Sequence, residues 1–285
     1  RAAFQVSPDG KWISYLAPYE RRLNIHVMPA TGGEARRITA ETARDIAGYA
    51  WKGSDRLIYA KDFGGDENFH IVSVDRSGAD LKDLTPFEKV RANIIDDLVE
   101  HPTDVIIAHN KRDAKVFDVY RVNIATGEAR QIAQNPGNIT GWKTDHEGKL
   151  RIAIATDGVN TTMMHRASED QPFAKVITTS FREAVEPLFF TFDNQKLYVS
   201  SNLGRDKAAI AIFDPATAKE EKVLHEHPEV DVDGLQYSRK RKVLTTVSWY
   251  TAKAERKFLD PVAEGVYADL LKQLPGYEVR VTGAN

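Results

Sequence analysis

The stretch Phe4-Gln5-Val6-Ser7-Pro8-Asp9-Gly10-Lys11-Trp12-Ile13-Ser14-Tyr15-Leu16 places two short segments of alternating apolar residues on either side of a tight turn. Alternation with a period of two is typical of β-strands that bury one face. In the turn, Pro8 presets φ, Asp9 caps its own backbone and Gly10 accepts a positive φ. The stretch therefore predicts a β-hairpin near the start of the chain.

The second strand of this hairpin recurs along the chain at a nearly constant interval. Six alternating segments begin at apolar anchors separated by 45, 48, 45, 47 and 46 residues. A second series of aliphatic residues, which closes each unit, steps by 46, 48, 45 and 46 residues. Two series in phase indicate a sequence repeat. The anchors are Trp12, Leu57, Val105, Leu150, Leu197 and Val243, and the closing residues are Ile38, Leu84, Ile132, Ile177 and Val223.

The length and strand content of the repeat predict the fold. Repeats of about 40 to 50 residues with four strands each are typical of β-propeller blades. A parallel α/β sheet would require alternating helices, and the sequence predicts only one helix. We predict an all-β fold in which residues 1–285 form a single β-propeller domain. The predicted repeats span approximately 4–46, 47–94, 95–136, 137–182, 183–229 and 230–276, with the start of a seventh at 277–285.

The one predicted helix runs from Asp260 to Leu274. Asp260 suits the N-cap, Pro261 suits the first helical position, and Pro275-Gly276 ends the helix. Its apolar residues Val262, Val266, Leu270 and Leu274 share one face. We expect this helix to decorate the sixth blade or to replace part of it, and the segment 277–281 to form the first strand of a seventh.

Composition excludes several classes of function. The 39 Lys and Arg residues nearly balance 41 Asp and Glu residues, so no net field attracts nucleic acid or anionic lipid. No apolar run approaches the roughly 18 residues of a membrane span. The absence of cysteine excludes disulfides and thiolate-bound zinc but leaves both the periplasm and the cytoplasm open. We expect neither a nucleic-acid nor a membrane partner, and we expect the natural N-terminus to lie upstream of Arg1.

Four motifs spread over the chain resemble those of one known family. They are the opening stretch 4–12, Gly64-Gly65-Asp66-Glu67-Asn68, Ser201-Asn202-Leu203-Gly204-Arg205-Asp206, and the late helix. Together they resemble the N-terminal β-propeller of the prolyl oligopeptidase family, especially its bacterial dipeptidyl-peptidase and acylaminoacyl-peptidase-like branches. The resemblance implies a serine peptidase whose propeller is joined to an α/β-hydrolase domain. A non-catalytic TolB-like propeller that binds a protein partner is the alternative, because such propellers use the same Ser-Pro-Asp-Gly turn.

The chain departs from the family pattern in one respect. A nucleophile elbow requires Gly-x-Ser-x-Gly between a strand and a helix, and this pentapeptide does not occur in the sequence. We therefore expect no catalytic residue in this chain and no peptide hydrolysis by the chain alone. Its expected partners are its own hydrolase domain and a peptide substrate, with a role in limiting access to the active site.

The loops that face the hydrolase domain follow from the strand order. Consecutive strands of a blade are antiparallel, so the loop after the second strand and the connection after the fourth emerge at the same end. We expect these second-strand loops to be longer and more charged than a minimal hairpin requires. They are 18–22, 62–68, 110–115, 156–160, 202–207 and 250–255.

Two of these loops contain candidate substrate-binding residues. Asp66, Glu67 and Asn68 follow two glycines, and a carboxylate there would pair with the α-ammonium of a peptide. The alternative is a solvated turn whose side chains cap their own backbone. Arg205 and Asp206 are candidates for a substrate carbonyl or carboxylate, with an ion pair across blades as the alternative.

A metal or cofactor site is not predicted. The segment His225-Glu226-His227 offers one His-x-His pair on an irregular stretch, which is too few ligands for a metal site.

Overall fold

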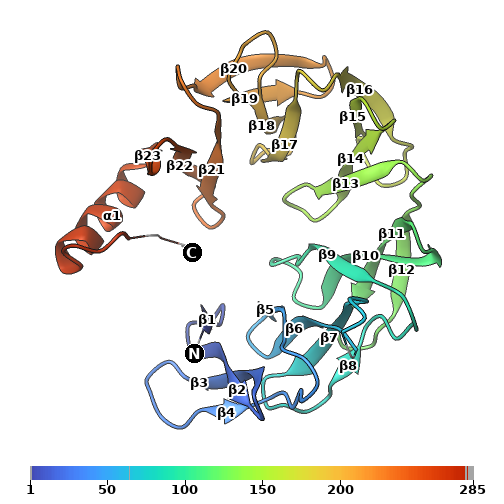
Figure 1. Cartoon of the computed structure of the whole chain (residues 1–285), viewed down its shortest axis with the longest axis vertical. Helices are drawn as coiled ribbons and strands as arrows, with labels where there is room; N and C mark the ends of the chain where they lie inside the picture. The colour runs from blue at the N-terminus through green and yellow to red at the C-terminus, as the bar shows by residue number, and fades with distance from the viewer. Residues whose placement is uncertain (1, 64, 280, 282–285) are drawn as a thin grey trace. The chain divides into compact units, whose positions relative to one another are not determined.

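The computed structural model describes residues 2–63, 65–279 and 281. The chain divides into two compact units, residues 1–139 and 140–285, and each unit contains three β-sheets. Figure 1 shows the sheets following one another in chain order within each unit. The boundary between the units falls close to the predicted start of the fourth repeat.

The first unit contains three four-stranded sheets. The first consists of β1 (Ala2–Val6), β2 (Trp12–Tyr19), β3 (Arg22–Pro29) and β4 (Arg36–Arg37). The second consists of β5 (Gly48–Lys52), β6 (Arg56–Lys61), β7 (His70–Asp75) and β8 (Lys82–Asp83). The third consists of β9 (Ala92–Asp96), β10 (Asp104–Asp113), β11 (Val116–Asn123) and β12 (Ala129–Ala133).

The second unit contains two four-stranded sheets, one three-stranded sheet and a helix. The fourth sheet consists of β13 (Ile139–Thr144), β14 (Leu150–Thr156), β15 (Thr161–His165) and β16 (Ala174–Thr179). The fifth consists of β17 (Val185–Phe190), β18 (Leu197–Ser201), β19 (Ala209–Asp214) and β20 (Lys219–His225). The sixth consists of β21 (Val232–Ser238), β22 (Val243–Tyr250) and β23 (Ala254–Phe258), followed by α1 (Pro261–Gln273).

The predicted anchors occupy equivalent positions in these sheets. All six lie in the second strand, in β2, β6, β10, β14, β18 and β22. Leu57, Val105, Leu150 and Leu197 are completely buried. Every sheet pairs its strands in consecutive order. The prediction of an all-β fold built from antiparallel blades is therefore confirmed, with three strands rather than four in the sixth sheet.

Neighbouring sheets within a unit bury their faces against each other. In the first unit, Ile58 of β6 and Ile71 of β7 form one apolar cluster with Val105 of β10 and Val122 of β11. Burial of one such aliphatic side chain contributes about 1.5–3 kcal/mol. Packing between consecutive repeats is therefore a main source of the fold's stability.

A buried lysine also joins the second and third sheets. Lys52, at the end of β5, donates hydrogen bonds from Nζ to the carbonyl oxygens of Leu98 (2.9 Å), His101 (2.8 Å) and Asp97. Burial disfavours its charged form and lowers its pKa to about 8. The ammonium satisfies three carbonyls of the turn between β9 and β10.

The turn between first and second strands has the same construction in the first and fifth sheets. Ser7 Oγ donates to Asp9 Oδ1 at 2.6 Å, and Thr191 Oγ1 donates to Asp193 Oδ1 at 2.5 Å. These hydrogen bonds favour the carboxylate and lower the pKa of Asp9 and of Asp193. The Asp9 backbone N–H also donates to Ser54 Oγ of the neighbouring repeat at 3.1 Å. The predicted turn chemistry is confirmed.

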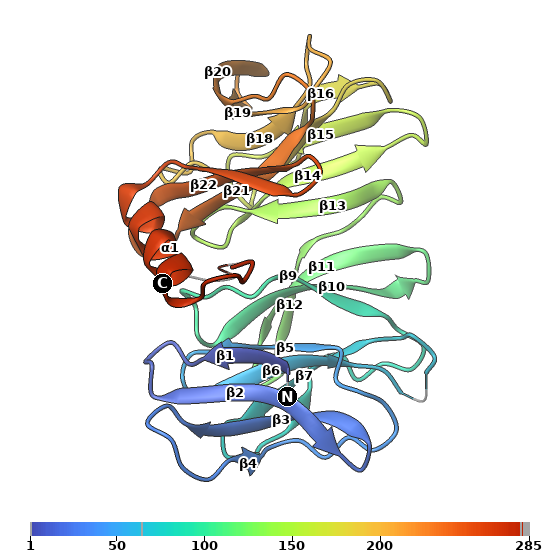
Figure 2. The same cartoon turned by 60° about the vertical axis from the view of Figure 1, so that its left-hand side comes forward.

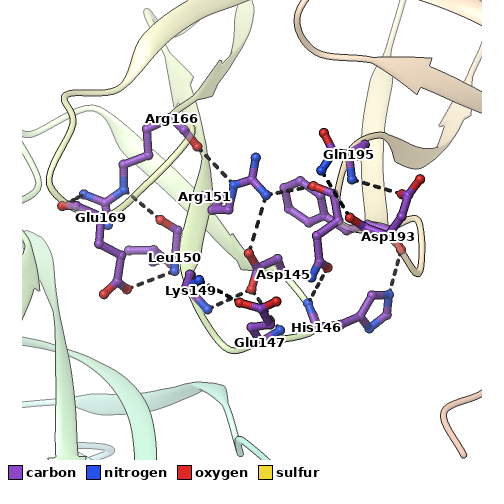
Figure 3. A network of polar contacts seen from close by, with 12 residues as sticks. Asp145, His146, Glu147, Lys149, Leu150, Arg151, Arg166, Glu169, Asp193 and Gln195 are labelled. Carbon is purple, nitrogen blue, oxygen red and sulfur yellow. Dashed lines mark hydrogen bonds and ion pairs between the residues drawn. The ribbon is translucent and has the colours of Figure 1, made fainter.

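The corresponding turn of the fourth sheet is the centre of a polar network (Figure 3). Asp145 Oδ2 lies 3.5 Å from Arg151 Nη1. The His146 backbone N–H donates to Asn194 Oδ1 at 3.0 Å, and His146 Nε2 lies 2.8 Å from the Phe190 carbonyl oxygen. Polar contacts at these turns thus connect the fourth sheet to the fifth.

The helix begins where the sequence predicts it. Asp260 is the N-cap and accepts a hydrogen bond from the Ala263 backbone N–H at 3.0 Å. Its carboxylate also pairs with Arg241, which lowers the pKa of Asp260 to about 2. Figure 1 shows α1 beyond β23, at the outer side of the three-stranded sheet. Within the described residues, no helix is long and apolar enough to cross a membrane.

The predicted first strand of a seventh repeat lies at the edge of the described structure. Residues 277–279 and 281 are described and carry no strand. Arg280 and residues 282–285 lie outside the described residues.

The second-strand loops differ in length more than expected. Tyr19 pairs with Arg22, so β2 and β3 are joined by Glu20 and Arg21 alone, both with positive φ (47° and 68°). The hairpin between β10 and β11 has a loop of the same length, since Asp113 pairs with Val116. The prediction of extended loops is wrong for these two repeats, because two residues suffice to join the paired strands. In the β2–β3 loop, the two positive φ values are those of a primed turn, which matches the strand twist. The β6–β7 loop is much longer, since Lys61 pairs with His70.

The three leucine anchors are completely buried, which predicts similar losses of stability when each is truncated. We expect Leu57→Ala, Leu150→Ala and Leu197→Ala each to lower the free energy of unfolding by about 2–5 kcal/mol, because each leaves a cavity in a closed core. Val223→Ala, at an exposed position of β20, is the control and is expected to cost less than about 1 kcal/mol. Chemical denaturation measures these values, and an anchor variant as mild as the control would contradict the equivalence.

Candidate functional site

The loop between β6 and β7 contains the first group of predicted site residues. The pair Lys61–His70 closes the loop at its base, and Gly64 lies outside the described residues. Asp66 accepts two hydrogen bonds from Asn68, at 3.0 Å from its backbone N–H to Oδ1 and at 3.0 Å from Nδ2 to Oδ2. These bonds favour the ionised form and lower the pKa of Asp66. The structure therefore brings Asp66 and Asn68 together as a capped turn.

Glu67 stands apart from this capped turn. Its φ of 60° lies in the left-handed region, which is uncommon for a residue with a long side chain. Its side chain is exposed and makes no hydrogen bond or ion pair with any residue in the described part of the chain. Backbone strain of this kind is found at binding and catalytic sites more often than elsewhere. Glu67 therefore combines a strained backbone with an exposed carboxylate that has no partner among the described residues, and it lies in the longest second-strand loop.

The base of the loop is held by ion pairs. The buried Asp62 places Oδ1 at 3.4 Å from Arg44 Nε, and Lys61 Nζ lies 3.0 Å from Glu41 Oε1. Lys61 Nζ also lies 4.6 Å from the centroid of the Phe63 ring. These contacts hold Lys61, Asp62 and Phe63 in place at the start of the loop.

A cavity of about 400 Å³ opens beside Asp66. At one wall, His70 Nδ1 lies 2.7 Å from Asp83 Oδ2, and the Phe63 ring packs edge-on against the His70 ring at 4.7 Å. The cavity is lined by Phe63, Asp66, His70, Asp83, Pro86, Phe87, Glu88 and Lys89.

The charged and aromatic side chains that line the cavity determine which class of ligand it can bind. Three carboxylates stand against one ammonium and one imidazole, so the negative charge favours a cationic ligand. Phe63 and Phe87 add aromatic surface, which attracts both cations and apolar groups. The Phe87 ring already carries Lys111 Nζ at 3.7 Å from its centroid. An organic ammonium with an apolar neighbour has the matching chemistry.

Sequence reasoning missed most of this cavity. His70, Asp83, Phe63 and Phe87 were not among the candidate site residues. Asp83 and His70 meet because β7 pairs with β8, so that the Leu84 backbone N–H donates to the Ile71 carbonyl at 2.8 Å. The sequence did contain one signal for this contact. Leu84 belongs to the series of aliphatic residues that close each repeat, which predicts that it lies in the fourth strand, next to the third strand.

The second predicted group, Arg205 and Asp206, lies in the loop between β18 and β19. The Arg205 guanidinium pairs with both carboxylate oxygens of Glu220 at 2.5 and 3.2 Å and donates to the Ser201 carbonyl at 2.9 Å. This ion pair joins the loop to β20 of the same sheet, so the predicted pairing across blades is wrong. Asp206 is largely exposed and lies 3.3 Å from Lys207 Nζ. Substrate binding by either residue stays a prediction.

The histidine pair considered for metal binding packs against an aromatic ring. His225 and His227 lie 4.8 and 5.7 Å from the Trp249 ring, measured between centroids. Burial lowers the pKa of His225, which favours its neutral form. His227 Nδ1 also accepts hydrogen bonds from the backbone N–H groups of Glu229 and Val230, at 3.2 and 3.3 Å.

Comparison with known proteins adds to this geometry. No family model matches the chain. Dipeptidyl aminopeptidase BIII from Pseudoxanthomonas mexicana is 35% identical over 282 residues, which cover 95% of this chain and 40% of that protein. A prolyl endopeptidase structure aligns with a TM-score of 0.57 at 15% identity, over 92% of this chain and 39% of that one. An oligogalacturonate lyase structure from Vibrio parahaemolyticus aligns with a TM-score of 0.55 at 14% identity, over 88% and 75%.

The sheets and the structural matches define a β-propeller domain. The structural matches are too distant in sequence to show more than this fold. The 35% identity adds a relative: the chain is homologous to part of dipeptidyl aminopeptidase BIII. It spans less than half the length of that relative.

The capped turn predicts a measurable titration. We expect Asn68→Ala to raise the pKa of Asp66 toward its ordinary value of 3.8, because both hydrogen bonds that favour the carboxylate are lost or weakened. Asn160→Ala is the control, since Asn160 caps Asp157 in the same way. In a carboxyl-carbon NMR titration, Asn68→Ala should raise the pKa of Asp66 alone, and Asn160→Ala should raise the pKa of Asp157 alone. An unchanged Asp66 in Asn68→Ala would contradict the capped turn.

Proposed function

We propose that this chain is the propeller part of a serine aminopeptidase and that it holds the free N-terminus of a peptide substrate at the β6–β7 loop. The supporting observation is Glu67, an exposed carboxylate on a strained backbone with no partner among the described residues, beside Asp66 at the edge of an acidic and aromatic cavity. The homologue is named as an aminopeptidase, an activity that requires recognition of a free terminal amine.

The chemistry of the loop suits this role. A terminal α-ammonium donates three hydrogen bonds, and charge-assisted bonds to carboxylates are about twice as strong as neutral ones. Asp66 is already held by Asn68, so its orientation costs little further entropy on binding. The carboxylate oxygens of Glu67 make no hydrogen bond within the described residues, so they can accept hydrogen bonds from the ammonium. When a second domain excludes water from the loop, the attraction between ammonium and carboxylate becomes stronger.

The same end of the sheets provides surface for a catalytic domain. In the second unit, Val159 and Tyr250 lie at second-strand loops, and Phe181 lies in the connection after a fourth strand. All three are exposed. Antiparallel order puts these positions at the same end of their respective sheets. An α/β-hydrolase domain over this end would bury them and restrict the substrate to short or unfolded peptides. The homology to an aminopeptidase favours this function over a non-catalytic TolB-like propeller.

The proposal assigns the chemical step to the hydrolase domain. We expect the 285-residue chain alone to show no hydrolysis of peptide or ester substrates, because its sequence lacks the nucleophile elbow Gly-x-Ser-x-Gly. Assays with chromogenic dipeptide and ester substrates measure this. Turnover that a serine-directed covalent inhibitor abolishes would contradict the assignment.

The role of Glu67 is tested in the full-length peptidase with paired peptides that have a free or a blocked N-terminus. We expect Glu67→Gln to reduce kcat/KM for the free-amine peptide by about 30-fold or more, mainly through KM, because a desolvated ammonium loses its charged partner. Asp66→Asn should have the same effect to a smaller extent. Glu34→Gln, an exposed carboxylate in the turn between β3 and β4, is the matched control.

Two results would overturn the proposal. An equal loss on free and blocked peptides would indicate damage to the contact between domains, and no loss on either would show that the carboxylate is only a solvated turn residue.

A further inference from the structure

Two phenylalanine rings line the cavity beside Asp66, and they come from two different segments. Phe63 lies in the β6–β7 loop, and Phe87 lies in the connection between β8 and β9. Phe63 is 50% exposed, although an aromatic side chain of its size gains stability from burial. Ligand sites are hollows that combine apolar and aromatic lining with a few polar groups. The two rings therefore form an apolar part of the cavity next to its carboxylates.

The Phe63 ring is held in place although it is exposed. It meets the His70 ring edge-on at 4.7 Å between centroids, and Lys61 Nζ lies 4.6 Å from its own centroid. His70 is itself held by Asp83, whose Oδ2 lies 2.7 Å from His70 Nδ1. A ring whose orientation is set before binding loses little entropy when a ligand packs on it.

The Phe87 ring is held in the same way by the third sheet, which lies beside the sheet of β6 and β7 (Figure 2). Lys111 of β10 places Nζ 3.7 Å from the Phe87 centroid, and the His109 ring packs edge-on at 5.5 Å. His109 is stacked on Tyr120 of β11 at 4.1 Å. Because a lysine already lies over one face of each phenylalanine, another cation gains little from either ring. The remaining ring surface suits an apolar group.

The available negative charge lies next to these rings. Both oxygens of Asp83 are occupied, since Oδ2 pairs with His70 and Oδ1 accepts from the Thr85 backbone N–H at 2.8 Å. Asp66 is exposed and lines the same cavity as the rings. The neighbouring Glu67 carboxylate has no partner among the described residues. An ammonium held by these two carboxylates therefore lies beside an aromatic cavity.

We propose that the cavity binds the first side chain of the substrate and selects an apolar, above all an aromatic, side chain. The inference rests on the proposed function, which places the α-ammonium at Asp66 and Glu67. In an N-terminal residue the ammonium and the side chain leave the same carbon atom, so the bound ammonium brings the side chain to Phe63 and Phe87. The volume of about 400 Å³ lies near the lower end of the range of about 300–1,000 Å³ for small-ligand sites, which suits one residue.

The selection follows from the charges and rings of the site. Asp66 and Glu67 repel an acidic first side chain. A basic side chain gains little from rings that already carry lysines, and glycine leaves both rings uncovered. Glu88 and Lys89, which also line the cavity, are adjacent charges of opposite sign and add no net charge.

The test compares first-residue preference in the full-length peptidase. Four peptides with a free N-terminus differ only in their first residue, which is phenylalanine, glycine, lysine or glutamate. We expect kcat/KM for the phenylalanine peptide to exceed that for the glycine peptide by about tenfold or more. Phe63→Ala should reduce this ratio at least about fivefold, whereas Phe63→Tyr, which keeps the ring, should preserve it. Phe4→Ala removes a ring of similar exposure (60%) from β1 and is the control, with an unchanged ratio expected.

A glycine or lysine peptide that is cleaved as well as the phenylalanine peptide would disprove the selection. An unchanged ratio in Phe63→Ala, even with a lower rate on every peptide, would show that the ring does not contact the first side chain and would also overturn the inference.

The variant Glu67→Gln, assayed on the same four peptides, separates this inference from the proposed function. A ratio that depends on Phe63 while Glu67→Gln leaves KM unchanged would support the aromatic subsite and disprove the binding of the ammonium by Glu67. A raised KM in Glu67→Gln without any preference for the first residue would disprove the subsite and leave the proposed function standing.

Discussion

Each sheet of this protein has two faces that must be covered, and a sheet of four strands covers neither by itself. Within each unit, the sheet of the next repeat packs against one face of the preceding sheet. Ile58 and Val105 make this contact between the second and third sheets. The second strand experiences this constraint most strongly, because it lies inside the sheet and between neighbouring sheets. Burial at Leu57, Leu150 and Leu197 is complete for this reason.

This constraint explains how much of the fold was predictable. A position that is buried on all sides accepts only apolar residues, so the buried anchors Leu57, Val105, Leu150 and Leu197 recur at a nearly fixed spacing in the sequence. The helix was predictable for a local reason, since Asp260 and Pro261 satisfy the first turn without any distant partner. The missing fourth strand of the sixth sheet followed from the same helix. These elements depend on short-range chemistry or on burial, and both leave a pattern in one sequence.

The features that the sequence did not predict depend on the register in which the strands pair. Glu20 and Arg21 form a turn with two positive φ values, although neither is the Asn or Gly that indicates such a turn. Arg205 meets Glu220 because β20 pairs with β19, which brings a residue fifteen positions away next to the loop. The site shows the same division. The Asp66–Asn68 turn is local, and the sequence offered it as the alternative to substrate binding, whereas the His70–Asp83 wall depends on how β7 pairs with β8.

The unequal second-strand loops have a consequence for how such domains diversify. Two residues suffice between β2 and β3, yet eight separate the paired ends Lys61 and His70, and both sheets keep the same strand order. Doubling a flexible loop costs only about 0.6 kcal/mol of closure entropy. Insertions at these positions are therefore nearly neutral for folding while they add new side chains at one end of the sheets. Lineages that carry this domain are free to acquire new recognition surfaces by lengthening a hairpin, without any change to the repeat that holds it.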